Sequence, residues 1–335
     1  MCYNKGGIWK IGAFFTERGD FFMKISFLRE LQNKFKQPQT AEEIEEIMEY
    51  IRESGINVTD LYQELEMTST YANIHKDRTH KKTNISLHSH SFYEVIFCRA
   101  ADRVDYLIGS RQYKLNAGDI VIIAPGIGHM PIFPEDMQYP YDRDIMWVNA
   151  GFMTKIVELF PNFNVEKMRS PLLLHTKGTS FGYIGDYFSD GIKETLNQKA
   201  GYDKIITAHA ILIISHILRA ISEGESAGFE PEKPTLINSL IEYIEGHLDE
   251  KLNLDEVAAH FYISRGTVNK LFRQSMDTTF YKFVTQRRLI LAKVLIGEGE
   301  SMESISQKCG FTDYSTFYKA FKKEYGISPR EYAKI

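Results

Sequence analysis

A helix-turn-helix pattern occurs twice near the end of this chain, and the spacing between the two copies is constant. In the later copy, residues 301–335, a short helix and a turn lead to a second helix that Asp313 caps. In the earlier copy, Ser264 caps the corresponding helix. Ser264 and Asp313 lie 49 residues apart, as do Phe272 and Phe321. The sequence therefore predicts a duplicated helical unit.

A long helix is predicted between the two copies, because apolar residues recur at helical spacing from Phe280 to Ile296. Such a helix would join the two units rigidly. After the second unit, Gly326 is placed to end its helix in the left-handed conformation. Ser328 and Pro329 then predict the start of one more short helix.

The second helix of each unit presents a polar face once its apolar side is packed. Val268 and Phe272 fix the inward side of the earlier helix, and Phe317 and Phe321 that of the later one. A polar, aromatic and basic face suits a helix in the major groove of DNA. The alternative is a helical bundle with a solvated basic face, but composition alone does not specify the repeated turns. The DNA-binding candidates are Arg265, Gly266, Thr267, Asn269, Lys270, Arg273, Tyr314, Ser315, Tyr318, Lys319 and Lys322.

Side-chain chemistry assigns roles to these candidates. In the first unit, Arg265, Asn269 and Lys270 are expected to reach base edges, because Arg pairs with guanine and Asn with adenine. Arg273 and Lys322 are expected to hold phosphates. In the second unit, the base-contacting candidates are Tyr314, Ser315, Tyr318 and Lys319.

The region from about Leu236 to Ile335 resembles the DNA-binding domain of the AraC/XylS family of bacterial transcription regulators. Two positions depart from the family pattern: Cys309 stands where a small residue is usual, and Gly266 weakens the start of the first recognition helix. The matching residues are Leu254 to Ala258, Ser264 to Phe272, Arg287, Arg288, Ala292, Ile305, Gly310, Phe311, Phe317, Phe321, Lys322, Lys323, Gly326, Ser328, Pro329 and Tyr332.

Charge is distributed unevenly along the chain. The whole sequence carries a net charge of −4, which taken alone argues against nucleic-acid binding. From Ala258 to the end, however, there are 13 Lys and Arg against 7 Asp and Glu, a local charge of +6. The basic end of the chain is thus the end with the duplicated unit.

The cysteine content and the length of the apolar runs also indicate the cellular compartment in which the protein is expected to act. The three cysteines, Cys2, Cys98 and Cys309, are widely spaced and give neither a disulfide framework nor a zinc-finger pattern, which fits a reducing cytoplasm. No run approaches the roughly 18 apolar residues of a membrane span, so no membrane partner is expected. Residues 1–22 are expected to precede the natural start, because the sequence from Met23 reads as a more usual opening.

The chain is expected to be an α+β protein with two domains and an N-terminal arm. Two helical patterns within residues 26–53 predict a helical arm over residues 1–82. Residues 83–222 are expected to form a sensor and dimerisation domain, and residues 223–234 a polar linker. Residues 235–335 are expected to form the all-α domain with the two helix-turn-helix units.

From about Thr83, short apolar segments with turn residues between them predict the strands of a small β-barrel. The segments are ISLHSH, FYEVIFC, VDYLI, RQYKL, IVIIA and IMWVNAGF, and Gly109-Ser110 predicts a hairpin turn between the third and the fourth. The pattern resembles the cupin barrel that many AraC-type regulators carry as a sensor. Two family motifs match, His88-x-His90-x3-Glu94 and Gly118-Asp119 leading through Pro125-Gly126 to His129.

The even spacing of His88, His90 and Glu94 places them on one face of a strand, from which they could converge inside the barrel. In enzymatic cupins, a matching set of three His and one Glu holds a transition metal. Here a glycine expected after the glutamate is absent, and the second motif places Pro125 four residues before His129 rather than five. We therefore predict that His88, His90, Glu94 and His129 contact a small ligand, with no metal, cofactor or catalytic residue. A metal site and purely structural histidines remain as alternatives.

An isoleucine-rich helix is predicted within DKIITAHAILIISHILRAIS, residues 203–222. Its apolar stripe is broader than one domain face needs, which favours a homodimer interface, and packing on its own barrel is the alternative. The leading hypothesis is a non-enzymatic regulator that binds double-stranded DNA and a small effector, the family-typical effector being a sugar, with RNA polymerase as a candidate partner. The rival is a metal-dependent cupin enzyme, an isomerase or dioxygenase, with an appended DNA-binding module.

Overall fold

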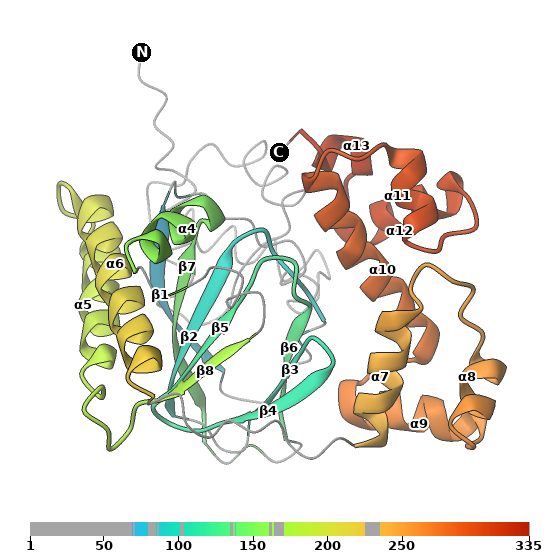
Figure 1. The fold of residues 1–335 in the computed structure, drawn as a ribbon, viewed down its shortest axis with the longest axis horizontal. Helices are drawn as coiled ribbons and strands as arrows, with labels where there is room; N and C mark the ends of the chain where they lie inside the picture. Colours follow the sequence, from blue (N-terminus) through green and yellow to red (C-terminus); the bar gives the residue numbers. More distant parts are fainter. Residues whose placement is uncertain are drawn as a thin grey trace, which may run out of the picture.

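The computed structural model describes residues 69, 71–79, 85, 87–100, 104–134, 137, 139–160, 163, 171–224 and 235–334. Figure 1 shows the strands gathered into one unit, with helices α4, α5 and α6 beside it, and helices α7 to α13 in a second unit. The patterns within 26–53 that predicted a helical arm, and most of the predicted linker, lie outside the described residues. The elements are β1 (Ala72–Thr79), β2 (Tyr93–Ala100), β3 (Val104–Ile108), β4 (Arg111–Leu115), β5 (Asp119–Ile123), β6 (His129–Ile132), β7 (Tyr141–Val148), α4 (Ala150–Glu158), β8 (Leu172–His175), α5 (Ile184–Asn197), α6 (Tyr202–Ser222), α7 (Leu236–Gly246), α8 (Leu254–His260), α9 (Arg265–Met276), α10 (Phe280–Gly297), α11 (Met302–Lys308), α12 (Tyr314–Tyr325) and α13 (Pro329–Tyr332).

The strands form two antiparallel sheets. One sheet has the order β1-β7-β2-β5-β8, and the other has the order β4-β3-β6. The predicted hairpin is confirmed: Val104 pairs with Leu115 and Ile108 with Arg111. Gly109 at its tip has a φ of 61°, a left-handed value that glycine adopts without steric cost. The two sheets face each other across a core that includes Tyr106, Val121 and Tyr141.

The predicted small β-barrel is present as two facing sheets and not as one closed barrel, and three of its strands differ from the sequence prediction. Strand β1 precedes residue 83, where the barrel was expected to begin, and pairs along its length with β7. Strands β6 and β8 were not predicted. Conversely, ISLHSH is not a regular strand: His88 makes an isolated bridge to His129, and His90 lies in a loop. Long-range pairing therefore decides which of these segments are strands.

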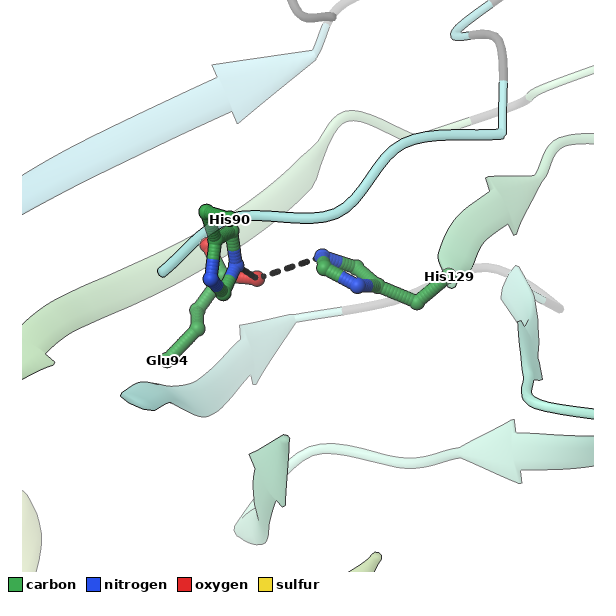
Figure 2. A group of neighbouring side chains, drawn as sticks. All are labelled: His90, Glu94 and His129. Carbon is green, nitrogen blue, oxygen red and sulfur yellow. Dashed lines mark ion pairs between the residues drawn. The ribbon is translucent and has the colours of Figure 1, made fainter. Parts of the chain in front are cut away.

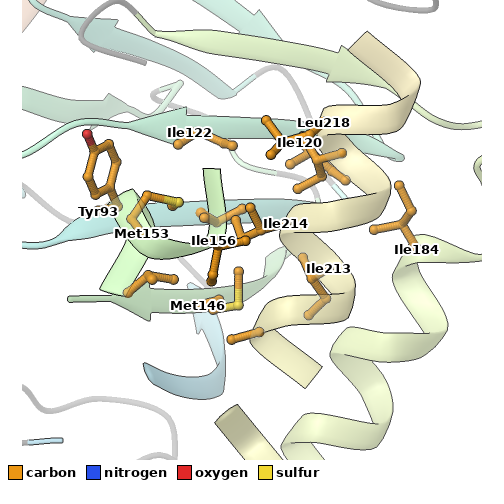
Figure 3. Close-up of a cluster of buried hydrophobic side chains, with 14 of the residues drawn as sticks. Tyr93, Ile120, Ile122, Met146, Met153, Ile156, Ile184, Ile213, Ile214 and Leu218 are labelled. Carbon is orange, nitrogen blue, oxygen red and sulfur yellow. The ribbon is translucent and has the colours of Figure 1, made fainter. Parts of the chain in front are cut away.

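The five-stranded sheet separates two cores, because its side chains alternate between its faces. Val95, Ile120 and Met146 point toward helices α4 and α6, whereas Ile96 and Val121 point into the barrel. Figure 3 shows Met153 and Ile156 of α4 and Ile213 and Ile214 of α6 packed over the strands. Complete burial of each such isoleucine contributes roughly 1.5–3 kcal/mol. These helices are therefore integral to the barrel unit.

Helix α6 combines a buried and an exposed apolar side. Ile206, Ile213 and Ile217 pack on the sheet, so the prediction of packing on its own barrel is confirmed for that side. Ile205, Ile211 and Leu212 are exposed, 36–42% of each side chain being accessible. The helix is also the one described segment with the length and hydropathy to cross a membrane, and 39% of its most apolar window is buried within the protein.

The helical unit follows the predicted pattern closely. Ser264 accepts the Thr267 N–H at the start of α9, and Asp313 accepts the Thr316 N–H at the start of α12. Gly326 ends α12 with a φ of 74°. Ser328 and Glu331 form a reciprocal capping box at α13, as Pro329 at its first position suggested. Because local side-chain caps determine where these helices begin, the helix boundaries could be predicted from the sequence.

Helix α10 is buried on more than one side. Phe283 and Ile290 belong to the core of the first helix-turn-helix unit, whereas Leu289 and Ile296 belong to that of the second. The sequence predicts one apolar side, marked by Phe283, Val284, Leu291, Val294 and Leu295, and this was wrong in part: several sides of the helix are buried, and Val294 is 37% exposed. Helix α10 therefore contributes side chains to both small cores. These buried contacts on two sides explain how it joins the units rigidly.

Candidate functional site

The first recognition helix, α9, is held by its cap and by the turn before it. Arg265, at its first position, forms an ion pair with Asp255 of α8 at 3.2 Å. Val268, Phe272 and Met276 are buried beneath the helix. The opposite side of α9 is thereby directed to solvent.

Most of the predicted DNA-contacting side chains of α9 lie on that outward side. Arg265, Gly266, Lys270 and Arg273 are exposed, and Thr267 is half-buried. Asn269 differs from them. It is half-buried, and its Oδ1 accepts the Phe280 N–H at the start of α10 at 3.2 Å. A structural bond that sequence reasoning did not foresee therefore occupies the Asn269 oxygen.

The second recognition helix, α12, presents a mixed aromatic and basic face. Ser315, Lys319 and Lys322 are exposed, whereas Tyr314 and Tyr318 are half-buried. The Tyr314 and Tyr318 rings lie 6.2 Å apart, and the Lys322 Nζ lies 6.0 Å from the Tyr318 ring centroid. Backbone and side-chain hydrogen bonds from Thr316 lower the pKa of Asp313, so this N-cap stays ionised. The face has the donors and stacking surfaces that DNA contacts require.

A separate polar site lies inside the barrel unit, at the cupin-like motifs. Figure 2 shows the side chains of His90, Glu94 and His129 converging. Glu94 Oε2 lies 3.0 Å from His129 Nε2 and 3.6 Å from His90 Nε2. Trp147 donates from Nε1 to the other carboxylate oxygen at 3.2 Å. His90 and Glu94 converge as expected, although His90 lies in a loop and not on the strand that the spacing argument assumed, and His129, placed by the cupin motif, joins them.

Backbone carbonyls fix the orientation of the two imidazole rings. His129 Nδ1 lies 2.9 Å from the Ile127 carbonyl, and His90 Nδ1 lies 2.8 Å from the Phe92 carbonyl. A carbonyl can only accept, so each Nδ1 carries the proton and each Nε2 faces Glu94. The carbonyls therefore determine which ring nitrogens are presented to the site.

Burial and pairing act on the titration of this site in opposite directions. Burial lowers the pKa of His90, although Glu94 opposes the shift. Burial works to raise the pKa of Glu94, but its interactions with His129 and His90 prevail and hold that pKa well below its ordinary value. For His90 and Glu94 the result is a neutral imidazole near an ionised carboxylate, and these are the protonation states of metal ligands.

His88 belongs to the same site but not to the tight cluster. Its ring centroid lies 4.3 Å from that of His129. Its backbone also exchanges two hydrogen bonds with His129, of 3.1 and 2.9 Å. By contrast, the donor atoms of His90, Glu94 and His129 all lie within 4.8 Å of one another. These three could hold a transition metal such as Zn²⁺, Fe²⁺ or Mn²⁺.

A small cavity, with about 20 Å³ of space, adjoins the cluster. Besides His88, Glu94 and His129, it is lined by Tyr106, Arg143 and Trp147, among others. Arg143 forms an ion pair with Asp77 and donates to Thr79 Oγ1 at 3.0 Å. Sequence reasoning missed these residues, although Arg143, Ile145 and Trp147 occupy alternate positions of β7 that face the barrel interior.

Two helix-turn-helix units on one rigid helix, with basic outward faces, define a DNA-binding regulator. Comparison with known proteins supports this class. Residues 257–335 match the family described as "Helix-turn-helix domain". The regulatory protein SoxS of Salmonella typhimurium is 33% identical over 98 residues, which are 29% of this chain and 92% of SoxS. The chain belongs to the AraC family of transcription regulators.

Two further relatives extend the similarity by different amounts. The HTH-type transcriptional activator RhaS of Escherichia fergusonii is 27% identical over 252 residues, which are 73% of this chain and 86% of RhaS. The probable transcriptional regulator LumQ of Photobacterium leiognathi is 32% identical over 122 residues, 36% of this chain. The match spans about half, 49%, of LumQ.

Proposed function

We propose that this protein regulates transcription by reading DNA with α9 and α12 while its barrel cavity senses a small molecule. One observation carries the proposal: exposed basic side chains occur on both recognition helices, Lys270 and Arg273 on α9 and Lys319 and Lys322 on α12. The polar cavity at Glu94 lies in a different unit, so sensing and reading would use separate surfaces.

The DNA-reading part can be tested with the full chain and a library of random duplexes. The selected sites should be long and asymmetric, with two preferred segments about 34–36 Å apart, one turn of the duplex. Lys270→Ala should relax preference in one segment and Lys319→Ala in the other, whereas Lys199→Ala, an exposed lysine of the barrel unit, serves as the control. Loss of preference in the same segment for both variants would contradict the assignment.

The lining of the cavity supports a hydroxyl-rich effector such as a sugar. Glu94, His129 and Arg143 offer acceptors and donors for hydroxyl groups, and Trp147 offers an aromatic face. A thermal-shift screen of sugars and small metabolites would identify it, because a ligand that binds only the folded state raises stability. His129→Ala should abolish the shift, and His260→Ala, an exposed histidine on α8, should retain it.

The geometry of His90, Glu94 and His129 also supports a second candidate, a metal-dependent cupin enzyme with an appended DNA-binding module. Metal analysis of the purified full chain would distinguish the two proposals. A stoichiometric transition metal that is lost in His90→Ala, together with turnover of a substrate, would favour the enzyme. A metal without turnover would instead make the ion part of the sensor.

The exposed side of the α5–α6 layer supports a homodimer. Leu196 of α5 and Ile205, Ile211 and Leu212 of α6 are exposed large apolar side chains. Leu212→Asp should convert a dimer to a monomer in gel filtration with light scattering, whereas Tyr139→Asp, an equally radical change at an exposed barrel residue, should not. An unchanged mass for Leu212→Asp would place the interface elsewhere.

A regulator of this kind would act in the cytoplasm, next to RNA polymerase at a promoter. The basic recognition faces require access to DNA, which supports that location. Retention of purified RNA polymerase on a complex of the protein with its selected DNA site would test the partner, with a scrambled site as the control. Equal retention on both sites would exclude a specific role.

A further inference from the structure

One face of α10 lies against the barrel unit. Arg287, Ile290 and Val294 lie three, four and seven residues apart, and Lys293 lies three residues after Ile290, so these residues share one side of the helix. Lys293 and Arg287 are buried although both are charged. The barrel residues that meet this face are those next to the candidate ligand histidines.

Lys293 makes the central polar contact. Its Nζ donates to the Ser89 carbonyl at 3.2 Å, and Ser89 lies between His88 and His90. The same ammonium lies 5.3 Å from the ring centroid of Tyr325, at the end of α12, and 5.2 Å from that of Tyr332 in α13. Such cation–aromatic contacts are favourable, most of all where water is excluded. Lys293 therefore joins the first histidine motif to the second recognition helix.

The second histidine motif meets α10 through glycines. A Cβ on Gly128 would overlap the Arg287 guanidinium, which Glu245 of α7 holds in place by an ion pair. A Cβ on Gly126 would lie 2.6 Å from Val294 Cγ2, closer than carbon atoms approach in proteins. These two positions thus need glycine for the close packing of α10, and Gly126 needs it also for its φ of 75°.

Apolar residues complete the contact. Leu87, beside His88, and Met130, beside His129, belong to the same buried cluster as Phe283 and Ile290 of α10. In an extended chain, successive side chains point to opposite sides. The histidines therefore face the cavity while their neighbours face the helical unit.

A short chain of contacts connects the cavity to α10. Glu94 Oε2 lies 3.0 Å from His129 Nε2. On the other side of the ring, His129 Nδ1 donates a hydrogen bond to the Ile127 carbonyl at 2.9 Å. Ile127 is followed directly by Gly128, which abuts Arg287. The paired backbones of His88 and His129 tie this path to the Ser89 contact.

We propose that the residues flanking the histidines, Leu87, Ser89, Gly126, Gly128 and Met130, form a clamp on α10 through which the state of the cavity alters the helix that carries both recognition units. Lys293 is the positioning residue of this clamp. The proposal rests on the sensing function proposed above and names its route. By thermodynamic linkage, a change that strengthens or weakens the contact of the clamp residues with α10 also changes the affinity of the cavity for its ligand.

The docked arrangement can be tested by a disulfide. The Cβ of residue 126 would lie 4.0 Å from that of residue 294, close to the mean of about 3.8 Å for disulfides. The full-length Gly126→Cys/Val294→Cys variant should form an internal disulfide on removal of reductant. Gly178→Cys/Val294→Cys is the matched control, because Gly178 also has a positive φ and its Cβ would meet nothing within 4 Å.

The native thiols described in the structure should not compete, because burial raises the pKa of Cys98 and of Cys309 to about 12. We expect the 126–294 pair to crosslink at least about tenfold faster than the control pair, since only its geometry suits a disulfide. Equal rates would overturn the clamp. Circular dichroism of both reduced variants confirms that they are folded.

The coupling can be tested without a known effector, by hydrogen exchange of the full chain. Glu94→Gln removes the carboxylate charge at nearly constant volume, and it should change exchange at residues 287–294 by about threefold or more. In the Lys293→Met background this change should disappear, whereas it should persist in the Lys323→Met background, where an exposed lysine of α12 is altered.

If Glu94→Gln leaves α10 exchange unchanged, or alters it equally with and without Lys293, the clamp is wrong. Continued protection of the β3–β4 hairpin shows in every variant that the barrel is folded. A ligand found by thermal shift would still establish sensing in that case, so failure of the clamp is distinct from failure of the proposed function.

Discussion

Tyr262, in the turn between α8 and α9, has an unusual backbone for a bulky residue. Its φ is 55°, and its side chain is 95% exposed. A left-handed conformation costs a non-glycine residue roughly 1–2 kcal/mol, while glycine loses roughly 0.5–1 kcal/mol more entropy on folding. We expect Tyr262→Gly to raise the free energy of unfolding by about 0.5–1 kcal/mol, measured by urea denaturation.

Tyr262→Phe serves as the control for that prediction, because it keeps the strained backbone and removes only the exposed hydroxyl. Its stability should match that of the unchanged protein. If Tyr262→Gly were instead destabilising, the ring would have a stabilising contact that the structure does not show.

Asn269 was predicted to contact a base edge, and the structure gives its side chain a bond that was not foreseen. An asparagine on a recognition helix suits adenine, but its Oδ1 accepts the Phe280 N–H at the start of α10. Removing such a bond leaves a buried donor unsatisfied, which typically costs about 1–3 kcal/mol. We expect Asn269→Ala to lower stability by about this amount in urea denaturation, and Lys270→Ala to leave stability unchanged. Equal stability of the two variants would show that the Asn269 bond contributes nothing.

At the scale of elements, helices were predicted better than strands. Ser264, Asp313 and Ser328 cap helices through local hydrogen bonds. A few neighbouring residues therefore determine where each of these helices begins. Strand β1 has the sequence ANIHKDRT, which lacks apolar alternation, and it is a strand because it pairs with β7 about 70 residues later. Arg143 and Trp147 were missed in the cavity for the same reason, since they reach it only through the pairing of β7 with β2 and the packing of the two sheets.

The exposed basic residues of α12 permit a prediction at this scale. Lys322 lies in the last turn, exposed, where its ammonium can reach a phosphate. Lys322→Ala should weaken binding to all DNA sequences alike and reduce the slope of log affinity against log salt by about 0.9, as expected for one phosphate contact. Gel-shift titrations over a salt series would measure this, with Lys199→Ala as the control. A loss confined to the specific site would make Lys322 a base reader.

At the scale of the whole molecule, the clamp on α10 predicts that the two units behave as one body. Asn238 of α7 adds to the contact by donating to the Ser110 carbonyl at 3.2 Å. Two domains joined only by a flexible linker would tumble independently. Two units that share a core containing Leu87, Leu107 and Met130 would tumble together. The composition of residues 223–234 predicts the site at which this difference can be measured, because a polar, Gly- and Glu-rich segment suits proteolysis.

Limited proteolysis should therefore cut first within residues 223–234, and the two fragments should still elute together in gel filtration under native conditions. The buried contacts of Leu87, Met130 and Lys293 would hold them after the peptide bond is gone. Lys293→Met, which leaves Ser89 without its ammonium partner, should let the fragments separate at a lower protein concentration, and Lys323→Met should not. Immediate separation of the unaltered fragments would show that covalent linkage alone keeps the units together, and first cleavage inside 250–330 would contradict the domain boundary itself.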